Sequence, residues 1–194
     1  MMRRFQWRAV LVGAVVLLAG CGSSPVTRFY TLSPAAPPSP AEPKVTMTVA
    51  IAAVTLPDGV DRPQIVLRGA ANQVAFSEFE RWVGSLKDEV ALSVAAGLNQ
   101  ALGGASVFAG PLRSGLSADI NVLLHVQRFD SVLGDAATVE VAWQVVPAKG
   151  AARTGLSSVR EATGGPGYDA LVAAHGRALA AVSRDIATAI RAAK

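Results

Sequence analysis

The tetrapeptide Leu18-Ala19-Gly20-Cys21 constrains this chain most, because it places the only cysteine at the end of an N-terminal export signal. Three arginines among the first eight residues precede an uncharged apolar run over residues 9–18, which is too short to span a bilayer. Small residues before a cysteine fit a lipoprotein signal peptidase, and the thiol can take a diacylglycerol through a thioether bond. We therefore predict a signal peptide over residues 1–20, cleaved between Gly20 and Cys21. A single cysteine allows no disulfide within the chain, so the fold must be stabilised by packing.

Lipidation of Cys21 predicts attachment to a membrane. One acyl chain binds a bilayer only marginally, at about 0.8 kcal/mol per buried methylene, whereas the three chains expected on Cys21 hold almost permanently. The next residue is Gly22, and in enteric bacteria an aspartate at that position favours retention in the inner membrane. We therefore expect the chain to be anchored to the outer membrane and to face the periplasm.

The mature chain is almost neutral. The full sequence has 18 Lys and Arg residues and 14 Asp and Glu residues. Three of the basic residues and none of the acidic ones lie in residues 1–20, so 15 basic residues remain beside 14 acidic ones. No basic stripe with interleaved aromatics is left, and we expect no nucleic acid partner. The 174 residues that remain of 194 suit one domain with a sizeable core.

Residues 21–43 are rich in proline, alanine and serine, which favours extended backbone with little packing. We interpret this segment as a lipidated tether. Within it, residues 28–32 are strand formers, so they either belong to the tether or form the first edge strand of the domain. A free tether of 22 residues would reach about 70 Å, and one of six residues only about 20 Å. Both alternatives stay open at the level of sequence.

Residues 44–194 carry the periodicities of a single α+β domain. Alternating apolar side chains predict strands over residues 45–56, 120–129 and 138–146, with a hairpin turn near Gly134-Asp135. Residues 64–68, which follow Pro63, and residues 157–161 are two further strand candidates. Apolar positions at helical spacing predict amphipathic helices over residues 81–102 and 168–193. We expect a mixed or antiparallel sheet of five to six strands with both helices packed on it.

The residues that could support catalysis are few. Nucleophilic hydrolysis needs a base, and the only histidines are His125, on the polar face of its strand, and His175, on the apolar stripe of the second helix. The adjacent carboxylates Asp88 and Glu89 are expected at surface positions of the first helix, where they favour its dipole. The run over residues 164–167 lacks the Lys-Ser/Thr ending of a phosphate loop and predicts a turn. We expect no enzyme, no cofactor and no metal.

Four side chains are candidates for contact with a partner. Arg62 and Gln64 flank Pro63 in a turn before a strand, and Phe79 and Trp82 place two aromatics beside the predicted helix start. The alternative for the first pair is turn chemistry together with an edge strand, and the alternative for Trp82 is packing in the core. Exposed aromatics at these positions would favour contact with a protein or a lipid.

Several segments share their order and spacing with a known family. Cys21 is followed by the segments 28–32, 61–68, 79–86, 126–130, 142–143 and 168–172 and by the apolar stripe over 179–190. In this order they resemble the PqiC-like family of ABC-type transport auxiliary lipoproteins. The chain departs from the family pattern at Val83-Gly84, which concerns the first turn of the predicted helix.

The resemblance implies a non-enzymatic auxiliary component of an MCE-type lipid transport system, whose ATPase and permease lie in the inner membrane. The lipoprotein would dock on the periplasmic MCE-domain protein at the outer end of the conduit, and phospholipid and further copies of the chain are possible partners. The resemblance supplies no catalytic residues. Two alternatives remain: a lipoprotein that binds a small ligand or peptidoglycan on its own, and a periplasmic hydrolase that depends on His125 or His175.

Overall fold

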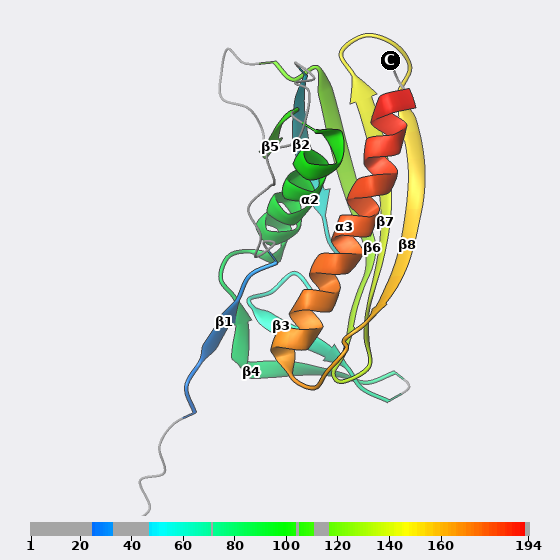
Figure 1. Ribbon diagram of the computed structural model, residues 1–194. Helices are drawn as coiled ribbons and strands as arrows, with labels where there is room; N and C mark the ends of the chain where they lie inside the picture. Colours follow the sequence, from blue (N-terminus) through cyan, green and yellow to red (C-terminus); the bar gives the residue numbers. More distant parts are fainter. Residues whose placement is uncertain (1–24, 33–46, 71, 104, 111–116, 193–194) are drawn as a thin grey trace, which may run out of the picture.

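The computed structural model describes residues 25–32, 47–70, 72–103, 105–110 and 117–192 (Figure 1). The predicted signal peptide, Cys21 and most of the predicted tether lie outside these ranges. The strands are β1 (Arg28–Tyr30), β2 (Thr48–Thr55), β3 (Gln64–Arg68), β4 (Val74–Trp82), β5 (Ser106–Ala109), β6 (Ile120–Val132), β7 (Ala136–Pro147) and β8 (Arg153–Ala162), and the helices are α2 (Leu86–Leu102) and α3 (Tyr168–Ala192). The α+β class and the two packed helices are confirmed.

The strands form two sheets, whereas we predicted one. The large sheet has the order β5-β2-β6-β7-β8, in which β5, β2 and β6 are parallel and β6, β7 and β8 antiparallel. The small sheet has the order β1-β4-β3, with β1 parallel and β3 antiparallel to β4. The predicted hairpin is present as β6 and β7, and Gly134 takes a left-handed conformation in its turn, with φ of 74°.

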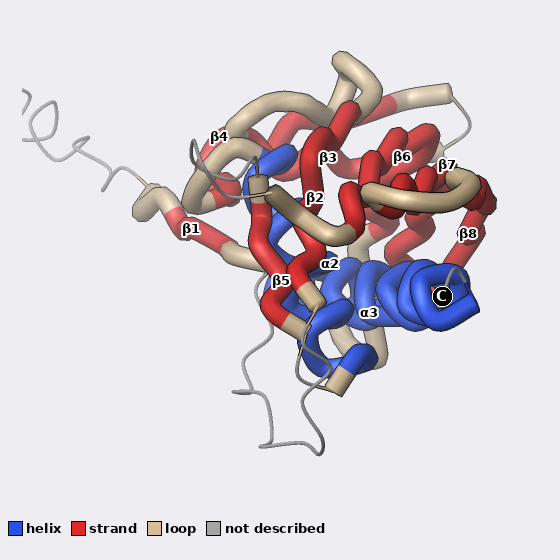
Figure 2. The backbone as a smooth tube through the Cα atoms, turned by 90° about the horizontal axis from the view of Figure 1, so that it is seen from above, coloured by secondary structure: helices blue, strands red, loops and turns tan. Residues whose placement is uncertain are grey.

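Both helices lie on the same face of the large sheet (Figure 2). The predicted apolar stripe of α3 is entirely buried, including Leu171, Leu179 and Ile190. Gly97 lets α2 approach α3 closely, because a Cβ atom at this position would lie only 2.5 Å from the Ser183 hydroxyl oxygen. Within the described residues, no helix is both long and apolar enough to cross a membrane.

The first helix begins later than we predicted. Residues 81 and 82 belong to β4, and α2 starts at Leu86, after the Ser85 side chain accepts the backbone N–H of Asp88 at 3.2 Å. The family departure at Val83-Gly84 therefore falls between strand and helix. The helix ends as expected, at Gly103 in a left-handed conformation.

Two strands were not among our predictions. β4 was missed because its register against β3 shifts between Gln64 and Val66, and such an irregularity breaks the two-residue alternation that marks a strand. β5 has only four residues, which is too short for a clear period. For residues 28–32, the structure shows the strand alternative, since β1 pairs with β4.

Candidate functional site

Most of the predicted contact residues meet on the small sheet. Gln64 on β3 lies across from Arg81 on β4, and Arg81 lies across from Phe29 on β1, so the three side chains form one row. The adjacent residues Tyr30 and Trp82 are buried. Because side chains alternate along a strand, the row lies on the face that points away from the core.

Apolar side chains extend this row. Phe79 and Val83 flank Arg81 at two-residue spacing and are 41% and 65% exposed, and Phe29 is 62% exposed. A groove of about 420 Å³ is lined in part by Phe29, Arg62, Arg81 and Val83. We call the set of Phe29, Arg62, Gln64, Phe79, Arg81 and Val83 the outer face of the small sheet.

Trp82 lies beneath this outer face. Its side chain is 4% exposed and packs edge-on against Phe129, with ring centroids 6.3 Å apart. The structure therefore gives Trp82 a packing role. Arg62, in contrast, is only partly buried: its Nε is enclosed without a hydrogen-bond partner, and its guanidinium covers the ring of Phe76 at 4.0 Å from the centroid.

Strand β1 is fastened to the rest of the domain. The Tyr30 carbonyl accepts the N–H of Val83 at 2.8 Å, and the Tyr30 hydroxyl donates to Glu80 at 2.6 Å. Burial and this bond to Glu80 raise the pKa of Tyr30 to about 12. The Tyr30 hydroxyl therefore stays protonated at any physiological pH and keeps its role as donor.

Glu89 holds the chain just after β1. Its carboxylate accepts the backbone N–H of Leu32 at 2.8 Å and the hydroxyl of Thr31 at 2.7 Å. We expected Glu89 at the surface beside Asp88, but it is only 5% exposed, so that expectation was wrong. The reason is tertiary: residues 31 and 32 pass over the first turn of α2 and cover the carboxylate.

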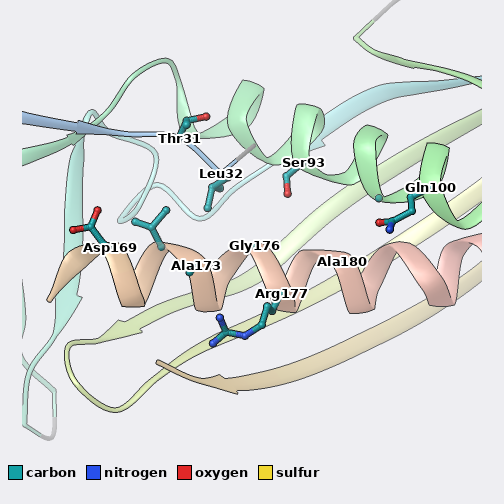
Figure 3. Close-up of a pocket in the computed structure, with 11 residues that line it drawn as sticks. Thr31, Leu32, Ser93, Gln100, Asp169, Ala173, Gly176, Arg177 and Ala180 are labelled. Atoms are coloured by element: carbon teal, nitrogen blue, oxygen red, sulfur yellow. The ribbon is translucent and has the colours of Figure 1, made fainter. Parts of the chain in front are cut away.

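A second groove, of about 430 Å³, lies between α2, α3 and the end of the β1 segment (Figure 3). Leu32 and Ser93 reach into the space between the helices, and Gly176 on α3 has no side chain to fill it. Arg177 lines the groove but points toward β8, where it donates to the Ala162 carbonyl at 2.5 Å. The lining side chains form no cluster of acid, base and nucleophile.

The structure pairs one histidine with a serine. The Ser131 hydroxyl lies 2.8 Å from Nε2 of His175, whose ring stacks on Phe129 with centroids 4.0 Å apart. Both side chains are buried, at 2% and 0% exposure. Burial lowers the pKa of His175 to about 3, against a smaller opposing effect of Asp130. The imidazole is therefore a weak base without access to substrate, and the pair fits a packing role better than hydrolysis.

The other histidine is exposed, as predicted. His125 lies on β6 with Nδ1 2.6 Å from the Thr55 hydroxyl. Across the described part of the chain, no three His, Cys, Asp or Glu side chains come together in a way that could hold a metal ion.

An ion-pair cluster joins the two sheets. Arg68 of the small sheet contacts Asp130 of the large sheet at 2.9 Å, and Arg128 contacts the same carboxylate at 2.5 Å. Burial by itself raises the pKa of Asp130, but hydrogen bonds from Arg68 and Arg128 outweigh it and hold this pKa below its ordinary value. The cluster thus fixes the small sheet against β6.

The family model described as "ABC-type transport auxiliary lipoprotein component" matches residues 30–187, from β1 almost to the end of α3. The chain belongs to this family. The match begins at Tyr30, the last residue of β1, and includes β2 to β8, all of α2 and most of α3.

Solved structures share the fold of this auxiliary lipoprotein. The crystal structure of an uncharacterised protein is 20% identical with a TM-score of 0.67, over 86% of this chain and 99% of that one. A Xanthomonas campestris protein of the DUF330 family is 22% identical with a TM-score of 0.57, over 83% of this chain and 93% of that one. No curated protein matches the chain.

The sequence missed some members of the auxiliary lipoprotein's outer face. Phe29 and Arg81 line it beside the predicted Arg62, Gln64 and Phe79. The strand formers in residues 28–32 are the sequence feature that could have identified these two residues. If residues 28–32 are taken as a strand, its pairing with β4 brings Phe29 and Arg81 into one row.

Proposed function

We propose that this auxiliary lipoprotein is anchored to the outer membrane through a triacylated Cys21 and acts in the periplasm as a non-enzymatic component of an MCE-type lipid transport system. In this proposal it docks on the MCE-domain protein of an inner-membrane ABC system. It then extends the path of phospholipid at its outer end.

The family match over residues 30–187 carries this proposal. It covers the folded unit and leaves Cys21 nine residues ahead of the matched region, which is the arrangement of a domain held near a membrane by a short N-terminal lipid anchor. The burial of the Ser131 and His175 pair supports a function without catalysis. The outer face supplies side chains for contact, with the exposed Phe79 and the partly exposed Arg62 and Gln64 as proposed contact residues.

In-cell crosslinking of the lipidated protein tests the proposal, followed by purification in mild detergent and mass spectrometry of bound proteins and lipids. We expect an MCE-domain protein among the crosslinked partners. Phospholipid enriched over a Cys21→Ala control would add direct handling of cargo. Recovery of the chain alone, with ordinary envelope lipid, would contradict the proposal.

A lipoprotein that binds a small ligand on its own is the second candidate. The groove of about 430 Å³ between α2 and α3 is the observation in its favour. Native mass spectrometry of the purified protein would then show one bound small molecule per chain, and an Ala173→Trp variant, which fills the groove, would lose it. Crosslinking to an MCE-domain protein, together with no small molecule bound to the purified chain, would exclude this candidate.

A further inference from the structure

We infer that the outer face of the small sheet rests on the phospholipid surface in which the lipid of Cys21 is embedded. This inference rests on the lipid anchor of the proposed function and adds to it the orientation of the domain on the membrane. Its occupant is a phospholipid bilayer surface, recognised through acyl chains and phosphate groups.

The length of the free chain supplies the first argument. Tyr30, Thr31 and Leu32 are bound to β4 and α2 by hydrogen bonds of 2.6–2.8 Å, so the tether ends where β1 begins. Only six residues separate Cys21 from Arg28. Six residues of extended chain reach about 20 Å, which keeps β1 close to the lipid.

The position of the small sheet supplies the second argument. Strand β1 and the small sheet lie at one end of the molecule, and the C-terminus of α3 lies at the other (Figure 1). A tether that ends at β1 therefore brings the small sheet toward the membrane first. The long strands of the large sheet extend away from it.

The side chains of the outer face supply the third argument. Phe29, Phe79 and Val83 are each more than two-fifths exposed, and Phe29 and Val83 line the groove. Aromatic and aliphatic side chains beside arginines suit the boundary between headgroups and acyl chains, where rings insert and guanidinium groups bind phosphate.

The two partly exposed arginines of the outer face can bind phosphate through the terminal nitrogens of their guanidinium groups, since Nε of Arg62 is buried. Arg62 makes a cation–π contact and Arg81 donates Nε to a backbone carbonyl, but neither forms an ion pair with any described residue. The neighbouring acids Asp61 and Glu80 are already paired, with Lys87 and Arg28. Of the other acids of β4 and of the turn before β3, Glu78 and Asp58 are left to compete with phosphate for the two guanidinium groups.

A fluorescence experiment on the lipidated mature protein, residues 21–194, tests this orientation. Because Cys21 is the only cysteine and its thiol is consumed by the lipid, a Phe79→Cys variant takes a single environment-sensitive label. The labelled protein is reconstituted into vesicles of phosphatidylethanolamine and phosphatidylglycerol that contain a phospholipid with a nitroxide near its headgroup. Phe108→Cys is the matched control, since Phe108 is 44% exposed and lies on β5 of the large sheet.

We expect the label at position 79 to shift to the blue and to lose most of its emission to the nitroxide lipid, and the label at position 108 to keep its emission. A Val83→Cys variant serves as a second label if the substitution of Phe79 impairs folding. Equal emission at both positions, in protein that floats with the vesicles, would overturn the inference and leave the anchor intact.

Two further outcomes would also overturn it and are distinguishable from the first. A blue shift at position 79 without quenching by the nitroxide lipid would mean that a second copy or another protein covers the outer face. Failure of the wild-type protein to float with vesicles would remove the lipid anchor itself, and with it this part of the proposed function.

Discussion

The Glu89 carboxylate on α2 accepts the backbone N–H of Leu32 at 2.8 Å, across 57 residues of sequence. The bond holds the residues that follow β1 against the first turns of α2. Removal of a buried acceptor leaves its donors unsatisfied, at a cost of about 1–3 kcal/mol.

We predict that Glu89→Ala lowers the free energy of unfolding by about 2 kcal/mol, measured by urea titration, because the buried Leu32 N–H loses its hydrogen-bond acceptor. Glu89→Gln keeps one acceptor oxygen and should lose less. Glu78→Ala removes an exposed carboxylate of the same region and serves as the control. Equal stability of the Glu78→Ala and Glu89→Ala proteins would show that the bond contributes nothing.

His175 should make stability depend on pH. Its ordinary pKa of 6.5 applies to the unfolded chain, and burial lowers it to about 3 in the folded chain. Between these values only the unfolded chain takes up the proton, so the free energy of unfolding is highest above pH 6.5. It falls on acidification, by up to about 1.4 kcal/mol per pH unit.

The test compares urea unfolding of wild type and His175→Gln from pH 7 to pH 4. The difference in free energy of unfolding should shrink as pH falls, because the variant lacks this titrating group while Asp130 is present in both. His125→Gln, at the exposed histidine, is the control for the loss of a histidine elsewhere in the domain. A difference that stays constant over this range would refute the assigned pKa.

The contact between Gly97 and Ser183 predicts a steric conflict between the helices. A Cβ added at Gly97 would lie 2.5 Å from the Ser183 hydroxyl oxygen and 2.7 Å from its Cβ. We expect Gly97→Ala to lower the free energy of unfolding by about 1–3 kcal/mol, as overpacking does. Thermal unfolding checks this, with Gly59→Ala as control, since nothing lies within 4 Å of a Cβ there.

Relief of the same conflict should restore stability. Combining Gly97→Ala with Ser183→Gly removes both close atoms, so the double variant should unfold at a higher temperature than Gly97→Ala alone. Additive losses in the double variant would mean that the two residues do not compete for this space.

Processing at Cys21 gives a prediction about the mature N-terminus. Mass spectrometry of the N-terminal peptide should find Cys21 as the first residue, carrying a diacylglycerol thioether and an amide-linked acyl chain. Cys21→Ala should yield no such peptide. An unmodified Cys21, or a mature chain that starts elsewhere, would contradict the predicted cleavage between Gly20 and Cys21.

Local patterns were sufficient for much of this fold. The alternation in β6 and β7, the turn at Gly134 and the buried stripe of α3 were all predictable, because each depends on residues close in sequence and on which side is buried. The family, too, was recognisable from the order of short segments along the chain.

Tertiary contacts decided what local patterns could not. The period of a strand shows which side is buried but not which strand is its neighbour, so the sequence could not separate the small sheet from the large one. The irregular register of β4 hid that strand, and with it the row of Phe29, Arg81 and Gln64. Glu89 is a polar residue on a helix by sequence and becomes a buried acceptor only because Leu32 passes over it. The sequence alone determined the α+β class and supplied the prediction of a signal peptide and a lipid-bearing Cys21, whereas only the tertiary structure showed that residues 28–30 pair with β4, because a strand's partner is set by contacts distant in sequence.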